Sequence, residues 1–236
     1  MASTHTQPRQ FVRLTKSQRI QHAILFVSTA LLIITGFMIE ADRWFIASFG
    51  SAAETIFWWR GWIHRIAGVA VTVICIYHLI YVTVNADGRS WFKDMLPRPS
   101  DAVFAWQNIM FMLGFRDARP KMDRFFYLEK LEYWSVYFGM FIVIVTGIML
   151  WTEYLWPKFY LDVAGAFHLG EATLAALAII IGHIFSVHYN AHVYPMNRAF
   201  LDGMISEELM KEEHGLWYER EMAKHGGTPH GGEPSA

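Results

Sequence analysis

Four long stretches of this chain carry no Asp, Glu, Lys or Arg, and they constrain its fold more than any other feature. They cover residues 20–39, 66–86, 133–152 and 172–197, and the last is expected to begin earlier, near Val163. A helix needs about 20 apolar residues to cross a hydrocarbon core of roughly 30 Å with its backbone amides bonded internally. We therefore predict an all-α integral membrane protein, a bundle of four helices.

Composition supports this reading. Hydrophobic residues make up 54% of the chain and charged residues 17%, whereas soluble domains average about 45–50% and about 25%.

The positively charged residues are distributed unevenly between the two sides of the predicted bundle. Sixteen of the twenty Lys and Arg residues precede the first span, lie between the second and third, or follow the fourth; the others are Arg43, Arg60, Arg65 and Lys158. The positive-inside rule then predicts that both termini and the central loop are cytoplasmic.

Three parts are expected along the chain. Residues 1–18 form a cytoplasmic N-terminus, residues 19–200 a membrane domain, and residues 201–236 a cytoplasmic acidic helix with a flexible tail. Within the central loop, the mostly apolar segment 101–115 is too short to span. We expect it to be an amphipathic segment along the cytoplasmic interface.

Several classes of function are excluded by what the chain lacks. Cys75 is the only cysteine, so the chain by itself cannot build a disulfide framework, an iron–sulfur cluster or a covalent Cys-x-x-Cys-His haem attachment. The formal net charge of −1 gives no reason to expect nucleic acid as a partner. No nucleotide-binding glycine motif or nucleophile triad is visible, and we predict no catalytic residue.

Histidines are concentrated in the spans. Seven of the eleven lie within or at the edges of three of them, and these are His22, His64, His78, His168, His183, His188 and His192. Ionisable side chains inside a membrane are costly and usually face a functional site. His64 and His78 are 14 residues apart and His168 and His183 are 15 apart, each about four helical turns and roughly 21–22 Å. Each pair therefore returns to one helix face.

The second and fourth spans run in the same direction, so His64 is expected level with His168, and His78 level with His183. Two imidazoles at matched depth suit bis-histidine ligation of haem b, because a neutral ring can bind iron while its other N–H is hydrogen-bonded. His22 opens a third span and leaves the inner ligation open. It can pair with His183, or His78 can pair with His183 while His22 and His188 hold a third haem.

Three further residues accompany the histidines. Glu171 follows His168 by about one turn and is a candidate for proton transfer or for orienting a ligand, or it caps the helix near the interface. Arg19 and Arg65 each lie close to a candidate ligand and are candidate partners for haem propionates.

The chain resembles the di-haem cytochrome b superfamily of formate dehydrogenase and nickel–iron hydrogenase membrane subunits. The resemblance covers about residues 15–205 and rests on Arg19-Ile-Gln-His22, His64-Arg-Ile-Ala-Gly68 with Tyr77-His78, residues 127–147, and His168-Leu-Gly-Glu171 with the segment from His183 to His188. It is closest to b-type subunits that accompany multihaem cytochromes c, on Tyr194-Pro195-Met196-Asn197 and the acidic segment 207–213.

The resemblance implies ligation by His22 with His183 and by His64 with His168. It implies a subunit of the bacterial cytoplasmic membrane that carries electrons between the quinone pool and a partner redox subunit, an iron–sulfur protein or a multihaem cytochrome c. Quinone or quinol is expected near the inner haem, around His22, His183 or Asn190. Here His168 and His183 are one residue further apart than the family's usual 14, and His78 and His188 are additional.

Two other classes of function are alternatives. His188-x-x-x-His192 is compatible with a non-haem di-iron membrane oxidase or hydroxylase, although such enzymes need several histidine boxes clustered at one membrane face. A metal or proton transporter with buried histidines as relays is the third class, and it predicts a colourless protein.

Overall fold

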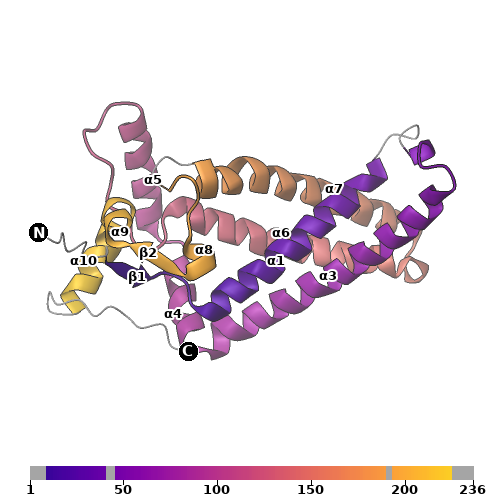
Figure 1. Cartoon of the computed structure of the whole chain (residues 1–236), viewed down its shortest axis with the longest axis horizontal. Coiled ribbons are helices and arrows are strands. Elements are labelled where there is room, and N and C mark those ends of the chain that lie inside the picture. The colour runs from indigo at the N-terminus through magenta and orange to yellow at the C-terminus, as the bar shows by residue number, and fades with distance from the viewer. Residues whose placement is uncertain (1–8, 41–45, 190–192, 225–236) are drawn as a thin grey trace, which may run out of the picture. The chain divides into compact units, whose positions relative to one another are not determined.

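The computed structural model describes residues 9–40, 46–189 and 193–224. Its four long helices are α1 (Lys16–Phe37), α3 (Ala52–Val84), α6 (Tyr127–Trp151) and α7 (Lys158–Leu177), which run side by side (Figure 1). α7 continues without a break through the π-helical segments η3 (Ala178–His183) and η4 (Phe185–Tyr189). All four are long and apolar enough to cross a membrane. The predicted all-α architecture with four spans is confirmed.

Two helix bounds differ from the expected ones. α3 begins at Ala52 rather than near residue 66, and its 33 residues extend for about 50 Å, so its ends project beyond a hydrocarbon core of roughly 30 Å. The fourth span was expected to reach residue 197, but residues 193–195 form turns. Pro195 has no amide hydrogen with which to continue a helix. The Asn197 N–H instead donates to the Val187 carbonyl at 2.8 Å.

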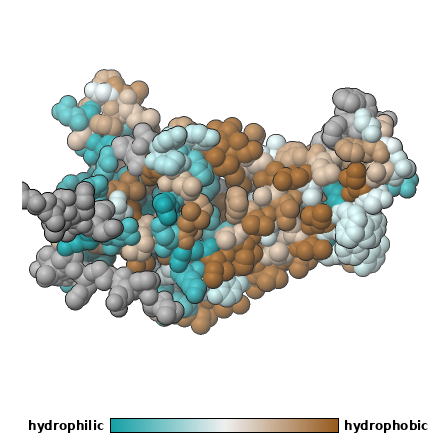
Figure 2. All heavy atoms as spheres, viewed as in Figure 1, coloured by the Kyte–Doolittle hydropathy of each residue, from teal (hydrophilic) through white to brown (hydrophobic). Residues whose placement is uncertain are grey.

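The bundle is one of two compact units of the chain and consists of Ile20–Asn85 and Ser135–Phe185. Small and branched side chains are buried along α3 and α7, as at Ala67, Val71 and Ala164. Large apolar side chains point outward instead, and the spans are hydrophobic over the face shown in Figure 2. Exposed apolar surface of this extent is suited to contact with lipid, where there is no water to avoid.

The C-terminal part of the fourth span is π-helical instead of α-helical. In η3 the Ile184 N–H bonds the Ile179 carbonyl, five residues back, instead of the usual four. A π-helical turn absorbs an extra residue within a continuous helix. The 15-residue spacing from His168 to His183 is therefore accommodated locally, between the two histidines.

The second unit gathers Met1–Arg19, Ala86–Trp134 and Ser186–Ala236. Strand β1 (Gln10–Val12) pairs antiparallel with β2 (Met204–Ser206), with Phe11 opposite Ile205. A small core of Ile205, Met210 and Trp217 lies beside these strands and includes residues of α9 (Glu207–Glu213) and α10 (Gly215–Lys224). This unit also contains α4 (Ala86–Met95), α5 (Pro99–Met112), α8 (Ala199–Asp202) and most of η4. Short 3-10 turns η1 (Met38–Glu40) and η2 (Glu153–Leu155) follow α1 and α6.

Ion pairs connect the three chain segments of this second unit. Arg13, with a side chain only 6% exposed, contacts Glu129 at 2.5 Å. Arg220 makes two hydrogen bonds to Asp123, at 2.6 and 3.0 Å. The N-terminal segment and the C-terminal helices are thus both bonded to the central loop, so these three segments must lie on the same side of a membrane.

The apolar segment of the central loop forms α5. Its outward side chains include Val103, Trp106 and Met112, of which Met112 is 76% exposed. Asn108, one turn before Met112 and with its amide 3.9 Å from the Met112 sulfur, is buried and donates to the Tyr127 hydroxyl at 3.0 Å. α5 is therefore fixed to its own unit by a polar contact and leaves an apolar face uncovered.

Candidate functional site

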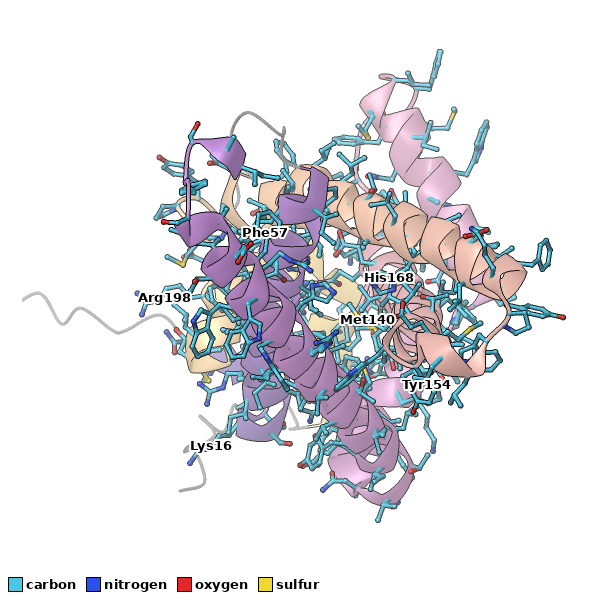
Figure 3. All side chains as sticks on the ribbon, turned by 90° about the vertical axis from the view of Figure 1, so that its right-hand side faces the viewer. Lys16, Phe57, Met140, Tyr154, His168 and Arg198 are labelled. Carbon is cyan, nitrogen blue, oxygen red and sulfur yellow. The ribbon has the colours of Figure 1, made fainter. Side chains whose placement is uncertain are left out.

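Two of the candidate histidines meet between α3 and α7. The ring centroids of His64 and His168 are 6.3 Å apart and the ring planes are inclined by 62°. Figure 3 looks along the bundle and shows His168 among the spanning helices, with Tyr154 at the periphery. Both histidines are half-buried. The sequence spacing predicted that these two histidines lie at matched depth, and in the structure they face each other.

A second pair of equal separation forms between α1 and η3. His22 and His183 have ring centroids 6.2 Å apart, with planes inclined by 44°. Of the two candidate partners of His183, the structure places His22 against it. The two pairs draw on three different spans, because α7 and its π-helical continuation contribute one histidine to each.

The separations match what one iron between two imidazoles requires. A metal–imidazole nitrogen bond is about 2 Å, and the ring centre lies about 1.1 Å behind the nitrogen, so two rings on opposite sides of one iron have centroids about 6.3 Å apart. Rings in van der Waals contact or in a direct imidazole hydrogen bond are under no such constraint. Two independent pairs at 6.2 and 6.3 Å therefore fit bis-histidine haem.

The other candidate ligands are placed differently. His78 lies on α3 with its Nδ1 2.8 Å from Gln21 Oε1, and Gln21 is buried. His188 is half-buried in η4 and belongs to the second compact unit. His192 and Asn190 lie outside the described residues. The structure thus brings His22, His64, His168 and His183 into pairs and gives His78 an amide partner.

The predicted propionate partners and the acidic residue have clear contacts. Arg65 lies over the rings of Trp62 and Trp151, at 5.9 and 5.8 Å from their centroids. Arg19 donates from Nη1 to the Leu201 carbonyl. The Glu171 carboxylate lies against α6 at Gly139, in space that a Cβ at that glycine would need.

Sequence reasoning missed the polar neighbours of the histidines. These are Gln21 beside His78, Thr35 beside His64, Thr146 beside His168, and Arg60. Arg60 precedes His64 by one helical turn, a spacing that the sequence displays, and donates from Nη1 to the Thr35 carbonyl at 3.0 Å. Its Nε is buried without a hydrogen-bond partner among the described residues. A guanidinium N–H left in this state beside His64 is a suitable donor for an anionic group such as a propionate.

The di-iron alternative was based on His188 and His192, of which His192 lies outside the described residues. Among the residues that the structure describes, no group of three or more His, Cys, Asp or Glu side chains is arranged to hold a metal ion. Di-iron sites in helical bundles need such a cluster of carboxylates and histidines.

Comparison with protein families identifies the class of protein to which the chain belongs. The family model described as prokaryotic cytochrome b561 matches residues 5–202. The chain belongs to this family. As a prokaryotic cytochrome b561 it is a haem b protein that carries electrons, and its four spans make it a multi-pass protein of the bacterial cytoplasmic membrane. The family predicted from the histidine motifs is confirmed.

Named relatives of this cytochrome b561 match along most of its length. The formate dehydrogenase cytochrome b556(fdo) subunit of Escherichia coli (strain K12) is 24% identical over 217 residues, or 90% of this chain and 93% of that protein. The nitrate-inducible cytochrome b556(Fdn) subunit of the same strain is 22% identical over 224 residues, or 93% and 94%. The formate dehydrogenase cytochrome b556 subunit of Haemophilus influenzae is 23% identical over 219 residues, or 90% and 84%.

Proposed function

We propose that this cytochrome b561 binds two haem b groups, one between His64 and His168 and one between His22 and His183, and passes electrons between the quinone pool and a partner redox subunit. The observation that carries the proposal is the equal separation of the two pairs, at 6.3 and 6.2 Å. Haem supplies one-electron redox chemistry at each position.

The protein's own residues account for the stability of such sites in a membrane. Each imidazole binds as a neutral donor, so ligation adds no net charge from the side chain to the hydrocarbon region. His168 and His183 lie 15 residues apart on one continuous helix, a rise of roughly 22 Å. The two sites therefore lie at different depths, as a pathway for electrons across a bilayer requires.

We infer two haems rather than three. A third haem would need His78 or His188 as a ligand together with a second imidazole. The imidazole expected opposite His78, that of His183, is paired with His22 instead. This supports assigning His78 to packing and hydrogen bonding rather than to iron.

The site for quinone is proposed at the inner pair, His22 and His183. His22 lies in the second helical turn of α1 and follows Gln21 directly, so the inner ligands lie close to the cytoplasmic end of the bundle under the predicted orientation. That orientation is supported by the bonds that join the N-terminal segment, the central loop and the C-terminal helices, since these segments hold sixteen of the twenty Lys and Arg residues. Asn190, the other polar candidate, lies outside the described residues.

The substrate-specific chemistry is proposed to reside in another subunit of a multi-subunit complex. The E. coli and H. influenzae relatives are named as subunits of formate dehydrogenases, which supports a membrane subunit that exchanges electrons with a separate catalytic protein. An iron–sulfur subunit or a multihaem cytochrome c on the non-cytoplasmic side, facing the outer pair, suits this role.

The test is the optical spectrum and haem content of the purified protein and its histidine variants. We expect a Soret band, a sharp α band on dithionite reduction, and two haems per chain by pyridine haemochromogen. His64→Ala and His22→Ala should each remove one of the two, and His78→Ala should remove none. A colourless wild-type protein expressed with ample haem, or loss of a haem in His78→Ala, would overturn the assignment.

A further inference from the structure

Two of the spans carry similar short sequences. Residues 33–38 of α1 and its end read Ile-Ile-Thr-Gly-Phe-Met, and residues 144–149 of α6 read Ile-Val-Thr-Gly-Ile-Met. The Thr-Gly steps are Thr35-Gly36 and Thr146-Gly147. Apolar residues on both sides are expected in any span, but a buried threonine followed by glycine at the same place in two separate helices is not explained by lipid contact.

Each threonine contacts one histidine of the outer pair, which is His64 and His168. Thr35 Oγ1 lies 2.8 Å from His64 Nδ1, and Thr146 Oγ1 lies 3.0 Å from His168 Nδ1. The threonine side chains are among the most enclosed polar groups of the bundle, since Thr35 is 4% and Thr146 is 9% exposed. α1 thus supports the histidine on α3, and α6 supports the histidine on α7, in the same way.

The direction of each hydrogen bond follows from the threonine's own helix. Thr35 Oγ1 lies 2.5 Å from the Leu31 carbonyl, and Thr146 Oγ1 lies 2.7 Å from the Ile142 carbonyl. A hydroxyl has one hydrogen and a carbonyl can only accept, so that hydrogen is donated to the carbonyl. The threonine oxygen must then accept from the imidazole Nδ1–H. Both rings are held as the tautomer whose Nε2 carries the lone pair that a metal needs.

The glycines provide room for the same rings. A Cβ built at Gly147 would lie 3.2 Å from His168 Cε1, and one built at Gly36 would lie 3.6 Å from His64 Cε1. The first distance is tighter than an ordinary contact, whereas the second is ordinary. The histidine ring therefore rests on the threonine through Nδ1 and on the glycine through Cε1, and the fit is closer on α6 than on α1.

We propose that Thr35-Gly36 and Thr146-Gly147 are paired positioning residues that fix the tautomer and orientation of both axial ligands of the outer haem and lower its midpoint potential. The inference rests on the proposed ligation by His64 and His168. A hydrogen bond accepted from Nδ1–H makes the imidazole a stronger donor, which favours the ferric over the ferrous state. Because both ligands of one haem are supported in this way, the two effects act on the same iron.

The test compares isosteric variants by redox titration and electron paramagnetic resonance (EPR) of the purified, haem-loaded protein. Thr35→Val and Thr146→Val keep the shape and remove the hydroxyl acceptor, while His168 retains the Val143 carbonyl as a second acceptor. We expect each to raise the midpoint potential of one haem and to change its low-spin EPR signal, with a larger shift in the double variant. Thr35→Ser and Thr146→Ser should restore both properties. The second haem, with ligands from His22 and His183, serves as an internal control for folding and should be unchanged.

Thr173→Val is a matched control. Thr173 lies on α7 and bonds the Leu169 carbonyl at 2.8 Å, four residues back, but no histidine of the described chain is bonded to it. This variant should leave both potentials unchanged. Shifts of the same size in Thr173→Val and Thr146→Val would show a general effect of losing a hydroxyl and would overturn the proposal.

The glycines give an independent comparison. Gly147→Ala should displace the His168 ring and lower the content or alter the EPR signal of the outer haem, whereas Gly36→Ala should leave both close to wild type. If the wild-type protein contains two haems and the valine variants leave the midpoint potentials unchanged, this inference is refuted and the proposed function is not. Wild-type protein without haem refutes the proposed function instead.

Discussion

His22 and His183 come from the first and last spans of the chain, and their imidazole centroids lie 6.2 Å apart. The separation equals that of His64 and His168 to within 0.1 Å, although the two pairs join different helices. Side-chain packing alone gives no reason for two imidazole pairs to share one separation. A common requirement, an iron held between two nitrogens, does.

The π-helical segment should tolerate removal of one residue but not addition of one. Deleting Ile180, which is 58% exposed within η3, allows the segment to relax to α-helix while His183 keeps its direction. Inserting an alanine after Ile180 rotates His183 by about 100° relative to His168. Haem analysis should give two haems for the deletion and one for the insertion. Equal haem contents for the two variants would contradict the role assigned to the π-helix.

The Arg13–Glu129 pair should be important for the stability of the second unit. The Arg13 side chain is 6% exposed, and Arg13→Met removes its hydrogen bonds to the Arg124 carbonyl and to Glu129, at a cost of about 1–3 kcal/mol. Arg13→Met should therefore increase the rate of proteolysis after residue 200 in membranes. Lys158→Met breaks the exposed Lys158–Asp162 pair and should have no measurable effect. Equal sensitivity in both variants would argue against this account.

The second unit should also lose stability in mild acid. Burial, and then the nearby Arg13 charge, lower the pKa of His214 to about 4, and its Nδ1–H donates to the Asp123 carbonyl at 2.9 Å. Because the unfolded chain binds a proton to this histidine near pH 6.5 and the folded unit does not, the stabilisation is complete above pH 6.5. It is lost as the pH falls towards 4, by on the order of 3 kcal/mol.

Hydrogen exchange of residues 204–224 at pH 7.5, 6 and 5 measures this dependence. Protection should fall with pH in the wild-type protein. Asp123 should contribute little in this range: although burial raises the pKa of this carboxyl, hydrogen bonds from Arg220 and the Arg124 amide and the charges of Arg220 and Arg98 bring it below its ordinary value. His214→Asn keeps a donor for the Asp123 carbonyl and should flatten the profile between pH 4 and 6.5. An unchanged slope in that variant would assign the acid sensitivity to another group.

The predicted orientation can be tested with single cysteines. Cys75 is the only cysteine and can be replaced by serine. In that background, Lys121→Cys in the central loop and Lys158→Cys at the start of α7 place thiols at side chains that are 64% and 85% exposed. A membrane-impermeant maleimide should label Lys158→Cys in intact cells and Lys121→Cys only after lysis. The reverse pattern would invert the proposed topology.

Sequence alone predicted the four spans because apolar transfer free energy adds up along about 20 consecutive residues, whatever their neighbours. It also predicted the family, since the histidine motifs are local. The start of α3 at Ala52 was missed because Glu54 and Arg60 interrupt the uncharged stretch by which the span was defined.

Sequence did not decide between His22 and His78 as the partner of His183, since helical spacing gives depth and face but not the rotation of one helix against another. The tertiary structure decided this, because packing brings His22 to His183 and places Gln21 beside His78. It also showed Thr35 and Thr146 as partners of His64 and His168. Such contacts join atoms from different helices, so they depend on interhelical geometry that no local pattern of residues specifies.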